Sequence, residues 1–310
     1  MRIRATVAAV SALSGALALS AIAAPAAQAE ESAGSVASYR AATAKIRQDA
    51  QAAQAESRSD RAGARYDLNV TFSNFKIAKA IKVGTTNHVA TTVTYTLTHG
   101  ADVDIKAADF ITDPIIYRGS FASPEASLLG NKPAKCTATS ATTANCKGTI
   151  DVYPGDHELI NSNAGTWRAA AEATAFNGQD PAGEEFDQSK VGYANKDGLG
   201  TTLMQRFSKL TVDASPEPVK KNKTITITGK LSRANWDRGT YNGYVEQPVQ
   251  LQFRKKNSDT YSTVKTIKTN ATGNLKTTVK ATQDGYFRYV FAGTTTTPAA
   301  NATGDFVDVQ

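Results

Sequence analysis

Along most of the chain after residue 65, apolar and polar side chains alternate with a period of two. The clearest stretch is residues 224–228, where two isoleucines alternate with three threonines. In residues 89–98, Val93, Tyr95 and Leu97 alternate with threonines in the same way. Successive side chains of a β-strand point to opposite faces, so the pattern predicts strands with one buried and one solvated face.

Residues 66–205 contain short runs of this kind, separated by polar turns. The predicted strands are residues 66–72, 77–83, 89–98, 115–117, 148–153 and 166–176. Residues 169–175 are rich in alanine and could be taken for a helix. Gly165 and the turn signal Asn177-Gly178 limit this segment to the length of a strand. Short strands at this spacing predict an antiparallel sandwich of the immunoglobulin-like kind.

Residues 206–310 have the strongest strand pattern in the chain. The predicted strands are residues 210–212, 225–231, 249–253, 261–269, 274–281, 286–291 and 306–309. Pro216 and Pro218 cannot donate to a sheet ladder, so they mark the edge of this domain. Seven strands in about 105 residues match an immunoglobulin-like or fibronectin-like sandwich. The predicted fold class is therefore all-β, with two immunoglobulin-like antiparallel β-sandwich domains in tandem.

The first 29 residues have the form of a signal peptide. Arg2 and Arg4 precede an apolar run at residues 7–24, and Ala27-Gln28-Ala29 matches a cleavage site. A membrane anchor is the alternative, because the run approaches the length that spans a bilayer. The small residues and the cleavage triplet favour removal, and we expect a secreted, extracellular protein. Its net charge would fall from +7 to +5, since the leader holds two arginines and no acidic residue.

Residues 30–65 are rich in Ala, Gln, Ser, Arg and Glu and lack a sustained apolar stripe. Their composition favours a helix, but Tyr39 and Ile46 are the only large apolar residues between positions 38 and 57. Two such side chains are too few to dock a helix firmly. We therefore expect a flexible or marginally helical spacer.

Charge is distributed unevenly between the two predicted domains. Residues 206–310 carry 16 Lys and Arg against 8 Asp and Glu, a net charge of +8, whereas residues 66–205 carry 11 against 15, a net charge of −4. A basic module could bind an anionic polymer of the cell wall or a secreted protein. The alternative is that these charges only solvate strand faces. Nucleic acid is not an expected partner, because no recognition helix or basic-aromatic motif is present.

Cys136 and Cys146 are the only cysteines, and nine residues separate them. In an exported protein, two cysteines this close are most simply one disulfide across a local hairpin. A redox pair or a metal site is the alternative, but the pair lacks the C-x-x-C spacing and a second pair of ligands.

Two loops are candidates for ligand binding. Asp180, Glu184, Glu185 and Asp187 form an acidic loop that could offer oxygen ligands to Ca²⁺, although their spacing does not match an EF-hand. The second loop, residues 232–247, carries three aromatic residues, and these are Trp236, Tyr241 and Tyr244. They could form a stacking platform for a sugar or a peptide. Alternatively, the tryptophan folds back over the open end of the sandwich.

No catalytic residues are predicted. The chain contains no G-x-S-x-G, H-E-x-x-H or P-loop motif. Asp156, His157 and Glu158 place three ionisable groups together, but adjacent residues of a strand diverge to opposite faces. A hydrolase that uses this triplet therefore remains a minor alternative.

Several stretches of the chain resemble a known bacterial module. These are residues 210–236, 248–254, 270–275 and 284–291. They resemble the immunoglobulin-like module at the C-terminus of many secreted proteins of Streptomyces and related actinobacteria. Residues 82–86, 136–146 and 165–167 are similar to the β-sandwich domain that often precedes it. The resemblance implies export and fold. Some of these proteins carry calcium-binding labels, but the resemblance supplies no catalytic or binding residue.

The sequence thus predicts a secreted, non-catalytic β-sandwich protein with an interaction or structural role at the cell envelope or in the medium. The alternative is a module that binds calcium or carbohydrate through residues 180–187 or the Trp236 loop. No cofactor other than that candidate Ca²⁺ is expected.

Overall fold

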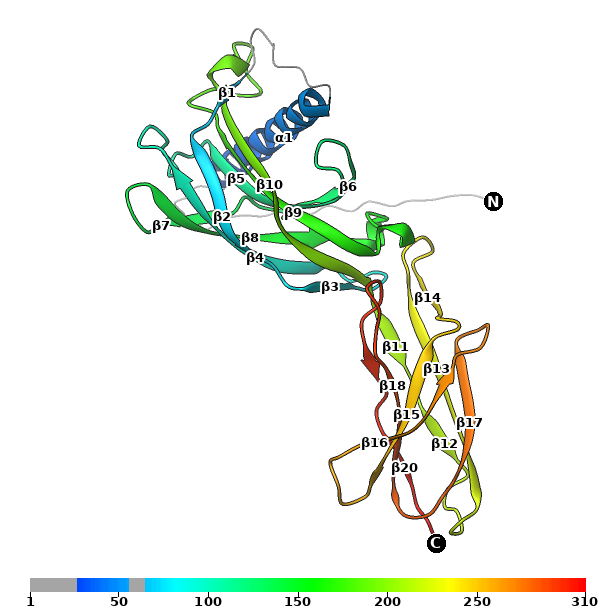
Figure 1. Cartoon of the computed structure of the whole chain (residues 1–310). Helices are drawn as coiled ribbons and strands as arrows, with labels where there is room; N and C mark the ends of the chain where they lie inside the picture. The colour runs from blue at the N-terminus through cyan, green and yellow to red at the C-terminus, as the bar shows by residue number, and fades with distance from the viewer. Residues whose placement is uncertain (1–26, 56–64) are drawn as a thin grey trace, which may run out of the picture.

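The computed structural model describes residues 27–55 and 65–310. The predicted signal peptide lies outside the described residues, except for its last three positions, where a helix begins. Within the described ranges, no helix is long and apolar enough to cross a membrane. Two β-domains follow the helix and lie end to end (Figure 1).

The first domain is built from two β-sheets. One sheet has the strand order β2-β4-β8-β7, and the other has the order β1-β10-β9-β5-β6, with β3 also paired to β10. The strands of the first sheet are β2 (Val70–Lys76), β4 (Val89–His99), β8 (Thr143–Val152) and β7 (Lys135–Ala138). The strands of the second are β1 (Tyr66–Asp67), β3 (Ala80–Val83), β5 (Phe110–Gly119), β6 (Pro124–Leu128), β9 (Gly165–Ala175) and β10 (Gly192–Arg206). Short 3₁₀ helices lie in the connections, at Pro154–Asp156, Asn161–Asn163 and Gln188–Lys190.

The strand order of this domain is that of an immunoglobulin-like sandwich. In the order in which they neighbour each other, β2, β4, β8 and β7 take the places of strands A, B, E and D, whereas β10, β9, β5 and β6 take those of G, F, C and C′. A common core joins the two sheets and includes Phe72, Leu97, Ile150 and Trp167. The prediction of a sandwich is confirmed here.

The alanine-rich segment is strand β9, as predicted, and its alanines follow from its position. It pairs with β10 on one side and β5 on the other. Residues 169–175 are all buried, because the β2-β4-β8-β7 sheet packs on one face of the strand and helix α1 covers part of the other. A strand covered on both faces lacks the usual alternation of apolar and polar residues.

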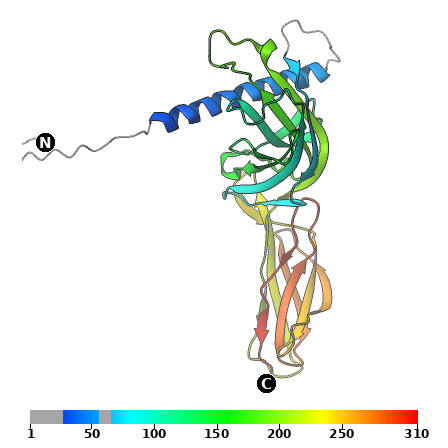
Figure 2. The same cartoon turned by 90° about the vertical axis from the view of Figure 1, so that its left-hand side faces the viewer.

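Part of the predicted spacer is helical and residues 56–64 lie outside the described residues, but the expectation that the helix would not dock firmly is wrong. Residues Ala27–Ala55 form one helix, α1, which lies along the outer face of the β5-β9-β10 sheet (Figures 1 and 2). Ile46 is 3% exposed and packs in a cluster with Phe176 and Tyr193. Thr43, Arg47 and Gln51 are buried as well. The docking face is therefore partly polar, which is why a search for an apolar stripe missed it.

The second domain is also a two-layer sandwich, and most of its strands match the predicted ones. The exceptions are residues 240–243, a strand inside the predicted loop 232–247, and residues 211–212, which lie between two strands. One layer holds β11 (Ser208–Leu210), β12 (Asp213–Ser215), β13 (Thr224–Asn235), β14 (Thr240–Gly243) and β17 (Asn274–Lys280). The other holds β15 (Pro248–Lys255), β16 (Ser262–Lys268), β18 (Gly285–Phe291), β19 (Ala300–Asn301) and β20 (Asp305–Val307). Ile225, Ile227, Leu251 and Tyr289 are buried between the layers, so the alternation read from the sequence is confirmed.

Candidate functional site

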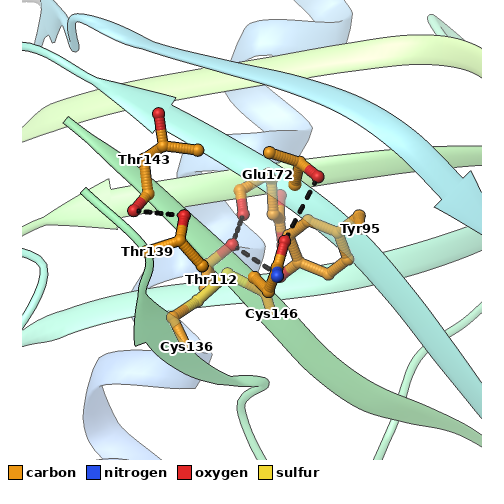
Figure 3. The surroundings of a disulfide bond; sticks show 9 residues. Tyr95, Thr112, Cys136, Thr139, Thr143, Cys146 and Glu172 are labelled. Atoms are coloured by element: carbon orange, nitrogen blue, oxygen red, sulfur yellow. Dashed lines mark hydrogen bonds between the residues drawn. A yellow bond between two sulfur atoms is a disulfide. The ribbon is translucent and has the colours of Figure 1, made fainter.

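Cys136 and Cys146 form the predicted disulfide. They are directly opposite each other on β7 and β8. The cysteines point toward the core, where Tyr95 lies opposite Cys146 and its hydroxyl forms a 2.8 Å hydrogen bond with Thr112 (Figure 3). This disulfide joins neighbouring strands of one sheet, whereas the conserved disulfide of antibody domains joins the two sheets.

Of the two interpretations of the Trp236 loop, the stacking platform is wrong for this residue. Its side chain is 0% exposed and packs in the core cluster of the first domain. The indole Nε1 donates to the Gly84 carbonyl at 2.9 Å, and the backbone N–H of Trp236 donates to Asn161 Oδ1 at 3.0 Å. The residue seals the junction between the domains instead of facing solvent.

Tyr241 and Tyr244 are half-buried beside basic side chains and do not complete a platform with the tryptophan. Lys209 Nζ lies 3.8 Å from the centroid of the Tyr241 ring. The guanidinium carbon of Arg233 lies 3.8 Å from the centroid of the Tyr244 ring. Each ring therefore already has a cation over one face.

The acidic loop does not gather its carboxylates. Within the described residues, no group of three or more His, Cys, Asp or Glu side chains is placed to hold a metal ion, and this includes Asp180, Glu184, Glu185 and Asp187. Asp187 Oδ1 instead accepts hydrogen bonds from the backbone and hydroxyl of Ser189, and these bonds hold the pKa of Asp187 below its usual value. Asp180 Oδ1 accepts from the backbone N–H of Ala182.

Asp156, His157 and Glu158 lie in a turn, and Glu158 forms a hydrogen bond that stabilises this turn. His157 adopts a left-handed conformation with φ of 56° after the first 3₁₀ helix. Glu158 Oε2 accepts a 2.7 Å hydrogen bond from the backbone N–H of Tyr153. The carboxylate therefore closes the turn.

The outer face of the β15-β18-β20 layer carries a feature that the sequence analysis missed, a ladder of alternating cations and rings. The ladder residues are Arg254, Tyr261, Tyr286, Arg288 and Phe306. The guanidinium carbon of Arg254 lies 3.8 Å from the centroid of Tyr286 and 5.5 Å from that of Tyr261. That of Arg288 lies 3.7 Å from the centroid of Tyr261. The rings of Tyr286 and Phe306 are 5.1 Å apart.

Strand register builds this ladder. Arg254 is directly opposite Tyr286, and Tyr286 is directly opposite Phe306. Phe287 and Tyr289 point into the core, so the alternate residues Tyr286 and Arg288 face outward. The sequence showed this parity, but it did not show which strands would be neighbours.

The two ladder arginines have no carboxylate partner among the described residues. Arg254 Nη1 donates to the carbonyl of Ser258 at 2.9 Å, and Arg288 donates from Nε and Nη2 to Gln252 Oε1 at 3.0 and 2.9 Å. A guanidinium has five N–H donors, so each arginine keeps donors for a further acceptor. Nearby, Lys256 pairs with Asp284 at 3.5 Å. The face therefore presents two oriented and uncompensated positive charges.

No protein-family model matches the chain, and no curated protein matches its sequence. Among solved structures, the adhesin InvE of Yersinia pseudotuberculosis is 13% identical, with 77% of this chain and 58% of that chain covered and a TM-score of 0.24. The chain thus spans 58% of the length of that adhesin structure. The D00-D0 domain of intimin is 13% identical, with 76% and 99% covered and a TM-score of 0.25. The Ig1–Ig3 ectodomain of mouse nectin-like molecule 4 is 10% identical, with 78% and 65% covered and a TM-score of 0.22. TM-scores of this size do not establish a common arrangement, so the immunoglobulin-like assignment stands on the strand order of the first domain and on the two-layer sandwich of the second.

Proposed function

We propose that this protein is an exported, non-catalytic binding protein, and that the ladder face of its second domain binds an anionic polymer at the cell envelope. The observation that carries the proposal is the pair of ring-stacked arginines, Arg254 and Arg288, neither of which has a described carboxylate partner. The leader read from the sequence supports export.

Electrostatics favours an anionic ligand for this domain. Residues 206–310 have a net charge of +8, so the field around the domain attracts polyanions and is screened as ionic strength rises. Stacking on the rings restricts the two guanidinium groups, which lowers the conformational entropy lost when an anion binds. A guanidinium also matches the geometry of carboxylate and phosphate groups.

The same ladder could serve only to stabilise the domain, and a charge-matched comparison separates the two roles. The test variant is Arg254→Gln combined with Arg288→Gln. The control is Arg238→Gln combined with Lys221→Gln, because both residues are exposed in the same domain and lie outside the ladder. Cell-wall fractions of the native host are washed in rising salt, and thermal unfolding of each variant is recorded.

We expect the wild-type protein and the control variant to be released at the same high salt concentration, and the ladder variant at a clearly lower one. A ladder variant that is less stable but retained like the wild type would refute a binding role. Wild-type protein found entirely free in the medium would refute envelope binding itself.

A further inference from the structure

The outer face of the β2-β4-β8-β7 sheet in the first domain is a grid of hydroxyl, amide and ammonium groups. Strand register arranges these side chains in rows that cross the strands. One row contains Ser73, Thr96, Asn145 and Thr137. On the other side of the grid, Thr92 lies opposite Thr149. Neighbouring strands are about 4.8 Å apart, so each row presents polar groups at close and regular spacing.

Between these two rows lies a row that contains three lysines. Lys76 is opposite Thr94, Thr94 is opposite Lys147, and Lys147 is opposite Lys135. All three lysines are exposed, and none of them forms an ion pair with a carboxylate in the described part of the chain. Like charges directly opposite each other destabilise a sheet. The row therefore costs stability in a domain whose net charge is otherwise negative.

Two structural devices hold this row in place. Lys135 and Lys147 are each adjacent to a cysteine of the disulfide, which fixes the pairing of β7 and β8. On β2, a β-bulge at Asn74 shifts the register between Ser73 and Lys76. Asn74 has a φ of 52°, and its side chain donates to Thr96 Oγ1 at 3.2 Å. The bulge reverses the parity of the strand and turns Lys76 outward, where simple alternation from Phe72 would turn it inward.

Two shallow depressions meet at Lys147. One has a volume of about 410 Å³ and includes Lys76, Thr94 and Asn145 in its lining. The other also has a volume of about 410 Å³ and adds Lys132 and Lys135. Together they form a hollowed track with four lysines.

The carboxylate in the lining of this track, Asp151, already forms hydrogen bonds with neighbouring groups and not with the lysines. Asp151 Oδ1 lies 2.7 Å from Nε2 of His88, and Oδ2 accepts from the backbone of Asn131 and the hydroxyl of Thr149. Burial alone would raise the pKa of Asp151, but these hydrogen bonds together outweigh it and hold the pKa below its usual value. Asp151 therefore organises the rim of the track and leaves its lysines unpaired.

We propose that this track binds an acidic polysaccharide, with its lysines on the carboxylates, and with Thr94 and the flanking hydroxyl and amide rows on the sugar hydroxyls. A polymer that carries anions without hydroxyls would leave those flanking rows unused. A protein partner fits less well, because the rows present no aromatic or large aliphatic side chain of the kind that dominates protein interfaces. The site is on the first domain and is independent of the ladder proposed above.

The test is calorimetric titration of the full mature chain at low salt with an oligogalacturonate of six sugars. The charge variant is Lys76→Gln with Lys147→Gln, and its control is Lys106→Gln, an exposed lysine outside the track. The hydroxyl variant is Thr94→Val, which keeps the β-branched shape and removes one hydroxyl at the centre of the lysine row. Thermal unfolding confirms that each variant is folded.

We expect affinity to fall about three- to fivefold for each lysine removed, consistent with exposed ion pairs, and to fall measurably for Thr94→Val. The Lys106 variant and the ladder variant should bind like the wild type. Unchanged affinity in the double lysine variant would overturn the proposal. Equal or tighter binding of linear polyphosphate, with no effect of Thr94→Val, would overturn the assignment to a polysaccharide. If only the ladder variant loses binding, the ligand belongs to the second domain.

Discussion

The docking of α1 depends on a buried ion pair, and this makes Arg47→Met the most informative single substitution. Arg47 Nη1 donates to Glu172 Oε1 at 2.6 Å, and the Glu172 side chain is only 1% exposed. The other carboxylate oxygen accepts from the Tyr193 hydroxyl at 2.9 Å. Removing one partner of a buried pair leaves an uncompensated charge, at a cost of about 3–5 kcal/mol.

The apolar contacts of the helix are too few to absorb this cost. Ile46 is the large aliphatic side chain that α1 buries completely, and its burial contributes about 1.5–3 kcal/mol. Tyr39, which lies 4.8 Å from the ring of Phe176, and two alanines are half-buried and add less. The penalty and the apolar contribution are therefore of similar size. In the variant, the state with a released helix, in which water hydrates the Glu172 carboxylate, therefore has a lower free energy than the docked state.

We therefore expect Arg47→Met to release α1 while the sandwich stays folded. Hydrogen exchange followed by mass spectrometry at pH 8 should show that the amides of α1 lose protection while those of β4 and β8 keep it. Burial raises the pKa of Glu172, so at pH 5 protonation of this carboxyl should partly restore docking. Lys45→Met is the matched control, because Lys45 is exposed on the same helix.

The double variant Arg47→Met with Glu172→Met decides whether the charge or the packing matters. Replacing a buried pair with apolar residues is often neutral, so the double variant should protect α1 better than the single one does. Full protection of α1 in the single variant would refute the reasoning. Equal loss of protection in the single and double variants would show that the helix needs the specific hydrogen bonds and not merely charge balance.

Three further predictions concern the junction, a buried acid and the disulfide. Trp236→Ala should lower the free energy of unfolding, measured with urea, by about 3–5 kcal/mol, because a buried aromatic side chain is replaced by a cavity. Trp236→Phe keeps an aromatic ring and should lower it clearly less. Equal effects of the two substitutions would contradict this reasoning. Burial raises the pKa of Asp113 to about 7, although the positive charge of Arg40 acts to lower it, so between about pH 4 and 7 the folded state keeps a proton that the unfolded chain has lost. The melting temperature should therefore fall as the pH rises from about 4 to 7. Asp113→Asn should make the melting temperature less dependent on pH in this range. Replacing both cysteines by serine should lower the free energy of unfolding by about 2–3 kcal/mol, since the bridged positions are 10 residues apart. An unchanged midpoint of the urea unfolding curve would show that the pairing of β7 and β8 needs no cross-link.

Strand β10 is an example of a strand that the alternation of apolar and polar residues does not predict. It is the longest strand, Gly192–Arg206, yet no strand was predicted there. A register shift between Lys196 and Gly200 interrupts its pairing with β9, and the residues around it are largely exposed. The alternation is therefore broken in the middle of the strand. Pairing with β1, β3 and β9 holds the strand together, and two of these partners, β1 and β3, are distant in sequence.

Local features of the chain were sufficient for much of the fold. The period of two at Ile225 and Ile227, the turn signal at Asn177-Gly178 and the short separation of the two cysteines each depend on a few neighbouring residues. Such features act through backbone geometry, which is why the all-β class, most strands of the second domain and the disulfide could be predicted.

Tertiary structure decided the rest, because each remaining feature depends on which distant residues meet. Trp236 is a core residue and not a ligand platform, since Gly84 and Asn161 of the other domain complete its hydrogen bonds. Arg47 becomes part of a docking face only because Glu172 lies beneath it. The ladder and the lysine row arise from strand register, which joins side chains far apart in sequence. Pairing of strands is a property of the whole sheet, and no local pattern in the chain contains it.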